Sequence, residues 1–165
     1  MTVPERVFVG LGANLGDARA TLHAAFDALA ALEQVQCIAR SSLYRSAPID
    51  AAGPDFVNAV AELRCALEPH ALLAALQAIE IKFGRERPYR HAPRTLDLDL
   101  LLFGDRRSAD ATLVLPHPRL QKRAFVLSPL AELAAELTLA DGRSVATTLA
   151  ALQAEHPQDI ERLAA

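Results

Sequence analysis

The chain has 165 residues, of which 52% are hydrophobic, and this composition suits one compact domain over residues 1–165 and argues against disorder. The net charge of −3 argues against a general nucleic-acid-binding protein. There is no apolar run long enough to span a membrane, and the first residues lack the basic start and apolar core of a secretory signal, so we expect a cytoplasmic location.

The first half of the chain alternates between strand and helix patterns. Apolar runs with β-branched residues predict the strands, and the spacing of Leu22, Phe26 and Leu29 after a capping Asp17 predicts the helix. The predicted elements are a strand at 7–11, a turn at 12–17, a helix ending near residue 33, a strand at 35–46, a loop at 47–54 and a strand at 56–67. We interpret the glycines of the segment 10–16 as a tight turn between strand and helix, with a phosphate-binding loop as the alternative.

The second half begins with another helix. Glu68 and Pro69 start it, and Gly84 ends it. The elements predicted after it are a polar loop at 85–93, a strand at 96–103, a short strand at 111–115, and helices at 125–133 and 145–154. The resulting order, βαββαβ, predicts an α+β protein with a ferredoxin-like core, a mostly antiparallel sheet, and an added C-terminal hairpin and helix region.

The strand at 96–103 carries two carboxylates among its leucines. Side chains alternate between the faces of a strand, so Leu96, Leu98, Leu100 and Leu102 are expected to share a core face, while Asp97 and Asp99 share the other. The two aspartate Cα atoms then lie about 6.6 Å apart. Carboxylates this close suit Mg²⁺ ions that also bind phosphates. The alternative is that each aspartate pairs with an arginine on an exposed face.

Basic residues gather near this strand. The segment 82–94 holds Lys82, Arg85, Arg87, Arg90 and Arg94 against a single acid, and a second group contains Arg119, Lys122 and Arg123. Carboxylates for a metal beside arginines for phosphate oxygens are the groups that phosphoryl transfer requires, and a basic loop next to them is able to close over a ligand. The usual phosphate-binding loop motif is absent from the sequence.

Several segments together resemble a known family. The residues at 90–101 (RHAPRTLDLDLL) resemble the signature of the 6-hydroxymethyl-7,8-dihydropterin pyrophosphokinases, and further likeness is found at 10–16, 42–48, 56–59, 116–119 and 123–130, in register from about Val7 to Leu139. The resemblance implies a ferredoxin-like fold, two Mg²⁺ ions, and transfer of pyrophosphate from ATP to the pterin hydroxymethyl group, releasing AMP, in folate biosynthesis. It implies ATP and the pterin as partners, with no nucleic acid or membrane, and a monomer.

The resemblance also assigns roles to residues by position. It implies catalytic roles for Arg85, Arg94, Asp97 and Asp99, with both aspartates as metal ligands. The implied ATP-binding residues are Leu73, Gln77, Glu80, Arg87, Arg94, His117 and Arg123. The implied pterin-binding residues are Ser46, Ala47, Ile49, Phe56, Asn58, His91 and Phe125, with Phe56 and Phe125 stacking on the ring. His91 stands where the family often has a tryptophan.

Each of these residues also has a purely structural interpretation. Phe56 and Phe125 would then be core residues, His117 a surface loop residue, Glu80 a solvated charge, and Asn58 a residue that bonds its own backbone. Two other functions remain as alternatives: a two-metal nuclease or nucleotide-sugar transferase that uses the Asp-x-Asp pair, and a ferredoxin-like ligand- or RNA-binding module without chemistry. The RNA-binding version would need exposed aromatics and a basic chain, whereas this chain has 5% aromatics and a negative net charge.

Overall fold

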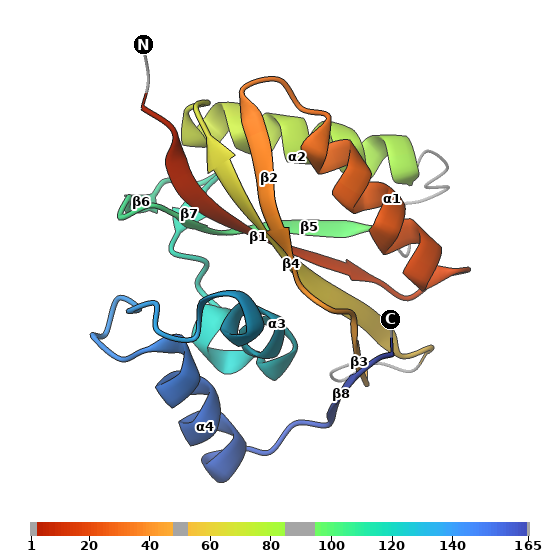
Figure 1. Ribbon diagram of the computed structural model, residues 1–165, viewed down its shortest axis with the longest axis vertical. Helices are drawn as coiled ribbons and strands as arrows, with labels where there is room; N and C mark the ends of the chain where they lie inside the picture. Colours follow the sequence, from red (N-terminus) through yellow and green to blue (C-terminus); the bar gives the residue numbers. More distant parts are fainter. Residues whose placement is uncertain (1–2, 48–52, 85–94, 165) are drawn as a thin grey trace.

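The computed structural model describes residues 3–47, 53–84 and 95–164, which form strands and helices (Figure 1). The strands are β1 (Glu5–Ala13), β2 (Val35–Arg40), β3 (Tyr44–Ser46), β4 (Phe56–Cys65), β5 (Asp97–Phe103), β6 (Ser108–Ala109), β7 (Val114–Leu115) and β8 (Ile160–Arg162). The helices are α1 (Ala18–Ala30), α2 (Pro69–Phe83), α3 (Ala124–Ala134) and α4 (Val145–Glu155), with a short 3₁₀ turn at Leu120–Lys122.

The main sheet has the order β5-β1-β4-β3-β8, and β2 pairs with β4 beside β3. Every pairing in it is antiparallel. The prediction of an α+β protein with an antiparallel βαββαβ core is therefore confirmed. The added C-terminal region is present too, as the β6–β7 hairpin followed by α3 and α4.

The strand predicted at 35–46 is divided into β2 and β3. Between them, Ser41 makes two hydrogen bonds with Val60 of β4. Its N–H donates to the Val60 carbonyl at 2.9 Å, and its hydroxyl accepts from the Val60 N–H at 2.8 Å. A side-chain acceptor replaces one backbone partner here, so the chain stays attached to β4 while the regular strand is interrupted.

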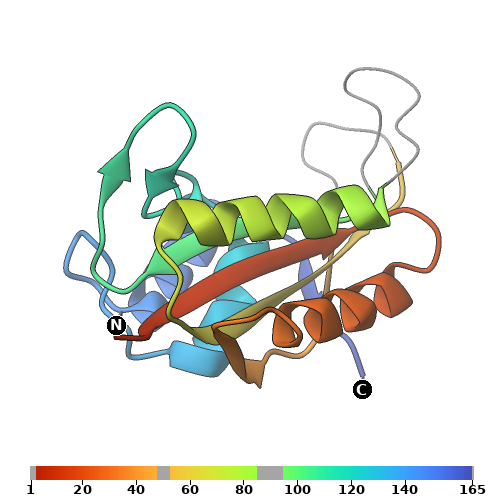
Figure 2. The same cartoon turned by 90° about the horizontal axis from the view of Figure 1, so that it is seen from above.

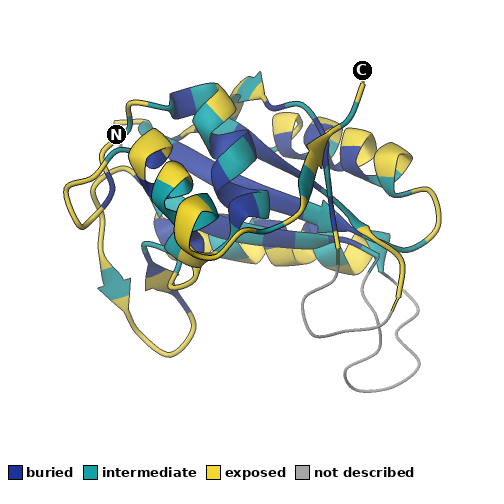
Figure 3. Cartoon of the chain, turned by 90° about the horizontal axis from the view of Figure 1, so that it is seen from below, coloured by how far each residue is buried: buried dark blue, intermediate teal, exposed yellow. Residues whose placement is uncertain are grey.

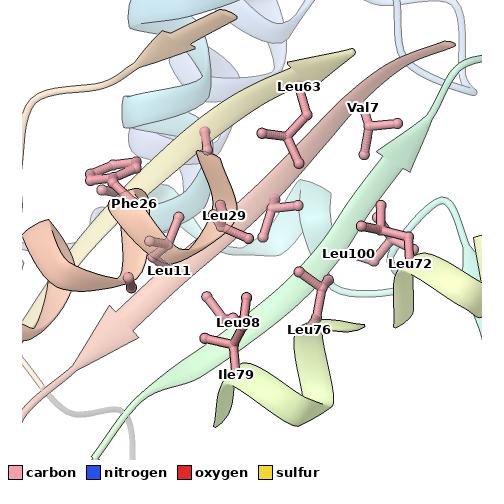
Figure 4. Packing of buried hydrophobic residues seen from close by; sticks show 14 of the residues in the cluster. Val7, Leu11, Phe26, Leu29, Leu63, Leu72, Leu76, Ile79, Leu98 and Leu100 are labelled. Carbon is pink, nitrogen blue, oxygen red and sulfur yellow. The ribbon is translucent and has the colours of Figure 1, made fainter. Parts of the chain in front are cut away.

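Helices cover both faces of the sheet (Figures 1 and 2). On one face α1 and α2 pack against the odd-numbered residues of β1, and this contact buries Leu22, Phe26 and Leu29 as the helical spacing predicted (Figure 4). Leu72, Leu76 and Ile79 of α2 and Leu98 and Leu100 of β5 complete this first core. Each buried leucine contributes about 1.5–3 kcal/mol.

On the other face α3 forms a second core over Phe8, Val60 and Leu101. The alternation of β5 changes there, because Val9 pairs with Leu100 and Phe8 pairs with Leu102, which leaves Leu101 as an extra residue. Leu102 therefore packs with Leu101 against the second core, and its predicted place on the face of Leu98 and Leu100 is wrong. One inserted residue reverses the side-chain direction of everything after it.

The C-terminal part of the chain packs on this second face. The predicted helices at 125–133 and 145–154 are confirmed as α3 and α4, and α3 buries its inner side while α4 is more exposed (Figure 3). The strand β8, which the sequence analysis did not predict, follows α4 and pairs with β3. Within the described ranges, no helix is long and apolar enough to cross a membrane.

Candidate active site

The second face of the sheet is covered by α3 along only part of its length, and a pocket of about 620 Å³ lies beside the helix. Its lining comes from five segments of the chain: β1, the β3–β4 region, β5, the turn before α3, and the first turn of α3. The described lining residues are Gly10, Leu11, Gly12, Ser46, Ala47, Phe56, Asn58, Ala59, Asp97, Asp99, Arg119, Lys122, Arg123, Phe125 and Val126.

Two glycines of β1 separate the acidic side of the pocket from its amide side. Across the sheet, Gly10 pairs with Asp99, while Gly12 pairs with Asp97 on one side and with Asn58 on the other. A Cβ on Gly12 would lie 3.2 Å from Asn58 Oδ1, closer than most real Cβ contacts. Both glycines lie inside β1, so interpreting them as a turn was wrong; only Gly16, with φ of 58°, lies in the turn. Their missing side chains leave the middle of the pocket floor open.

Asp97 and Asp99 both line the pocket and are half-buried, as their alternation in the strand predicted. Asp99 Oδ2 lies 3.9 Å from Arg123 Nη1, and Asp99 Oδ1 lies 4.0 Å from His117 Nε2. Both distances exceed hydrogen-bond length. The carboxylate of Asp99 is 43% exposed, so its neighbours attract it without enclosing it.

His117 lies at the outer edge of β5, where its N–H donates to the Leu101 carbonyl at 2.9 Å. Its Nδ1 accepts from the N–H of Arg119 at 3.1 Å, which turns Nε2 toward Asp99. Burial, together with the nearby arginines, lowers the pKa of His117, and the charge of Asp99 opposes this shift. The interpretation of His117 as a plain surface residue is therefore wrong, since its imidazole is largely buried beside Asp99, although His117 is not among the residues that line the pocket.

Arg123 precedes α3 and forms the cationic side of the pocket. Burial lowers the pKa of its guanidinium, and Asp99 opposes that effect. The guanidinium also lies over the ring of Phe125, 5.4 Å from its centre. These contacts hold a cation beside the two aspartates, where a phosphate group would find both charge and hydrogen-bond donors.

An amide and two aromatic rings form the remaining sides. Asn58 is buried and donates from Nδ2 to Ser46 Oγ at 2.7 Å, so its polar bond is to a neighbouring strand rather than to its own backbone. Ser46 pairs with Phe56 across β3 and β4. Phe56 and Phe125 are half-buried and both line the pocket, and Phe125 also packs against the second core.

The three sequence-predicted residues of α2 do not line this pocket. Leu73 packs against the first core and Gln77 is exposed, on the opposite side of the sheet from the pocket. Glu80 accepts a hydrogen bond from the Leu98 N–H at 2.9 Å, at the outer edge of β5, so it is not simply a solvated charge. Five further predicted residues lie outside the described ones: Ile49, Arg85, Arg87, His91 and Arg94.

The pocket also contains residues to which the sequence analysis gave no individual role. Arg119 and Lys122 line the pocket beside Arg123, and Gly10 and Gly12 form its floor. The basic group was visible in the sequence, and the alternate spacing of the two glycines fits one face of a strand. What the sequence lacked was the pairing that sets these residues next to Asp97.

The donor set suits a hard cation that is shared with a ligand. Among residues 3–47, 53–84 and 95–164, no group of three or more His, Cys, Asp and Glu side chains could hold a metal ion by itself. Asp97 and Asp99 offer two carboxylates on one face, and Mg²⁺ needs only one or two when phosphates and water fill its other positions. The residues present therefore fit Mg²⁺ bound together with a phosphorylated substrate.

Comparison with known proteins identifies relatives over most of the chain. The family model described as 7,8-dihydro-6-hydroxymethylpterin-pyrophosphokinase (HPPK) matches residues 8–135. The chain is 49% identical over 160 residues to the 2-amino-4-hydroxy-6-hydroxymethyldihydropteridine pyrophosphokinase of Pseudomonas aeruginosa, covering 96% of this chain and 97% of the relative. It is 41% identical to the protein of the same name from Methylorubrum extorquens, covering 96% and 98%.

Solved structures share the fold at much lower sequence identity. The chain aligns with Plasmodium falciparum HPPK-DHPS, wild type with pterin and p-hydroxybenzoate, with a TM-score of 0.74 and 12% identity. The alignment covers 94% of this chain, but the chain spans only 44% of that longer protein. This structural similarity supports the fold, whereas the family model and the two bacterial relatives show the family to which the chain belongs.

Proposed function

Because the chain belongs to the 7,8-dihydro-6-hydroxymethylpterin-pyrophosphokinase family, it is a pyrophosphokinase of folate biosynthesis, and we propose that it carries out its reaction in the pocket beside α3. The reaction transfers pyrophosphate from ATP to the hydroxyl of 6-hydroxymethyl-7,8-dihydropterin and releases AMP. The observation that carries the proposal is the row Asp97–Gly12–Asn58 across the sheet, which sets an acidic group and an amide on either side of a bare floor.

The amide side of the pocket binds the pterin. Asn58 presents an amide beside the floor and is held in place by its hydrogen bond to Ser46. A flat heterocycle that carries its own amide group has the complementary hydrogen-bond donor and acceptor. Phe56 and Phe125 supply aromatic faces for stacking. Ala47 lines the same side, and Ile49 and His91 complete the proposed pterin contacts.

The acidic and cationic sides bind the triphosphate. In this proposal Asp97 and Asp99 would hold two Mg²⁺ ions. When bound, the ions would neutralise charge on the phosphates. Arg123 and His117, which both lie near Asp99, contact the phosphate oxygens. The reaction needs no covalent nucleophile from the protein. The chain orients the pterin hydroxyl for direct in-line attack on the β-phosphorus and stabilises the negative charge on the phosphate oxygens in the transition state.

The α2 residues act from the other side of β5. Leu73, Gln77 and Glu80 face the nucleotide in this proposal, and Glu80 also fixes the strand that carries both aspartates through its bond to the Leu98 N–H. Arg85, Arg87 and Arg94 act on the phosphates and the leaving AMP. We also propose that residues 1–165 work as one domain and as a monomer in the cytoplasm.

Product identification tests the function directly. The protein is incubated with ATP, Mg²⁺ and 6-hydroxymethyl-7,8-dihydropterin, and phosphorus NMR follows the nucleotides and the pterin. We expect AMP and pterin diphosphate in equal amounts, no turnover without the pterin, and no turnover after chelation of the metal. Formation of ADP, or cleavage of DNA or a nucleotide sugar in its place, would contradict the proposal, and pterin binding without any turnover would favour a binding module.

A further inference from the structure

The C-terminal segment bonds the backbone beside the pocket through the side chain of Gln158. Gln158 lies between α4 and β8, and its side-chain Oε1 accepts from the N–H of Ala124 at 2.8 Å. Its Nε2 donates to the carbonyl of Lys122 at 3.0 Å. One amide therefore bonds the backbone on both sides of Arg123, the residue whose guanidinium lies next to Asp99.

The Gln158 side chain caps the start of α3, which has no side-chain cap of its own. Arg123 occupies the N-cap position of α3 but makes no side-chain hydrogen bond there. A helix leaves its first N–H groups without intrahelical partners, and Gln158 supplies the acceptor for the first of them. Without that acceptor and the matching donor to Lys122, the backbone on both sides of Arg123 would lose one hydrogen bond each and would depend on the 3₁₀ turn before it and the helix after it.

Gln158 is itself fixed in the same way. Its N–H donates to Gln153 Oε1 at 2.7 Å, and its carbonyl accepts from Gln153 Nε2 at 3.0 Å. Two amide side chains in succession thus connect α4 to the turn before α3. Just beyond, β8 pairs Ile160 with Ser46, so the same segment also reaches the strand on the pterin side of the pocket (Figure 1).

We infer that Gln158 is a positioning residue that acts through Arg123, and that the C-terminal segment sets the geometry of the triphosphate side of the pocket. The inference deepens the proposed function and rests on Arg123 binding phosphate. Because the two hydrogen bonds are made to backbone atoms, the loss should appear as a misplaced guanidinium rather than a lost charge.

A double-mutant cycle separates positioning from general stability. Binding of a non-hydrolysable ATP analogue with Mg²⁺ is measured by calorimetry for the wild type, Gln158→Ala, Arg123→Ala and the double variant. We expect Gln158→Ala to weaken binding by roughly three- to tenfold in the wild-type background. In the Arg123→Ala background the same change should have almost no effect, because the group it positions is gone.

The control is Gln36→Ala, which removes an exposed amide from β2, outside the proposed site, and should leave binding unchanged. Circular dichroism checks the fold, and if Gln158→Ala does not fold, Gln158→Glu keeps the acceptor for Ala124 but loses the donor to Lys122. Equal losses in both backgrounds, or no loss at all, would overturn the inference. Since binding is measured without turnover, this result is independent of whether AMP is the product.

Discussion

The two ends of one sheet face differ in what covers them. Under α3 the face carries Phe8, Val60 and Leu101, which pack into the second core. Two residues further along β1 and β4 the same face carries Gly10 and Asn58 and belongs to the pocket. An antiparallel sheet often keeps one polar face, but here a single face is divided between core and site. The helix supplies stability at one end, and its first turn supplies Phe125 to the other.

The difference shows how a small domain builds a rigid site. Asp97 and Asp99 belong to a strand whose other residues, Leu98 and Leu100, are buried on the opposite side. The carboxylates therefore stand on a backbone that is fixed by the first core. A site held on strands places its groups more accurately than one held on loops. Changes in the pocket should accordingly alter catalysis and spare folding, while changes under α3 should do the reverse.

The largest expected effect is on the aspartates. Asp97→Ala and Asp99→Ala should each lower the rate of AMP formation by roughly a hundred- to a thousandfold, because each removes a negative group that the proposed transfer step needs. Melting temperatures should stay near the wild-type value, since both side chains are only half-buried. Asp105→Ala, in the exposed turn after β5, is the matched control and should retain full activity. Activity of Asp97→Ala within about twofold of the wild type would disprove the role of the pair.

Leu130→Ala tests the covered end. Leu130 is fully buried in the second core and does not line the pocket. Its truncation should lower the free energy of unfolding by roughly 2–5 kcal/mol, through lost burial and the cavity left behind. Urea unfolding measures this, and Leu133→Ala, at a partly buried site of the same helix, should cost less. The folded variant should still bind the ATP analogue with nearly wild-type affinity. If its binding free energy fell by as much as its free energy of unfolding, the two ends would not be independent.

Gly12→Ala begins to convert the open end into a covered one. The new Cβ would lie 3.2 Å from Asn58 Oδ1, so the amide has to shift. We expect pterin binding, measured by calorimetry with the ATP analogue and Mg²⁺, to weaken by roughly three- to tenfold. Gly10→Ala adds a methyl to the same floor but meets Leu101 at an ordinary 3.5 Å, so it leaves Asn58 in place and should weaken binding less. Equal losses in the two variants would mean that the position of Asn58 is not what matters.

Tyr44 joins the two ends and should have the smallest effect. Its hydroxyl donates to Glu132 Oε1 of α3 at 2.7 Å, and burial, reinforced by Glu132, raises its pKa from 10.0 to about 12. The folded state thus keeps the proton longer than the unfolded state, so this contribution is complete below pH 10 and is lost as the pH rises through about 12. Unfolding of the wild type should become easier over that range more steeply than that of Tyr44→Phe. Parallel pH profiles for the two proteins would contradict this assignment.

Local patterns in the sequence determined a large part of this protein. The periodicity of Leu22, Phe26 and Leu29 gave α1 its buried side, and the alternation around Asp97 and Asp99 placed both carboxylates on one face. These features depend on residues a few positions apart, whose directions are fixed by the helix and strand geometry. The family resemblance was likewise carried by short segments in register.

Only the tertiary structure decided how these segments meet. The pairing of β1 with β5 and β4 turned Gly10 and Gly12 from apparent turn residues into the pocket floor, and the extra residue at Leu101 moved Leu102 to the other face. The bonds of Gln158 to the backbone around Arg123 span more than thirty positions of sequence. Register and packing between distant segments depend on the whole fold, because no local pattern specifies which residue of one strand lies opposite which residue of another.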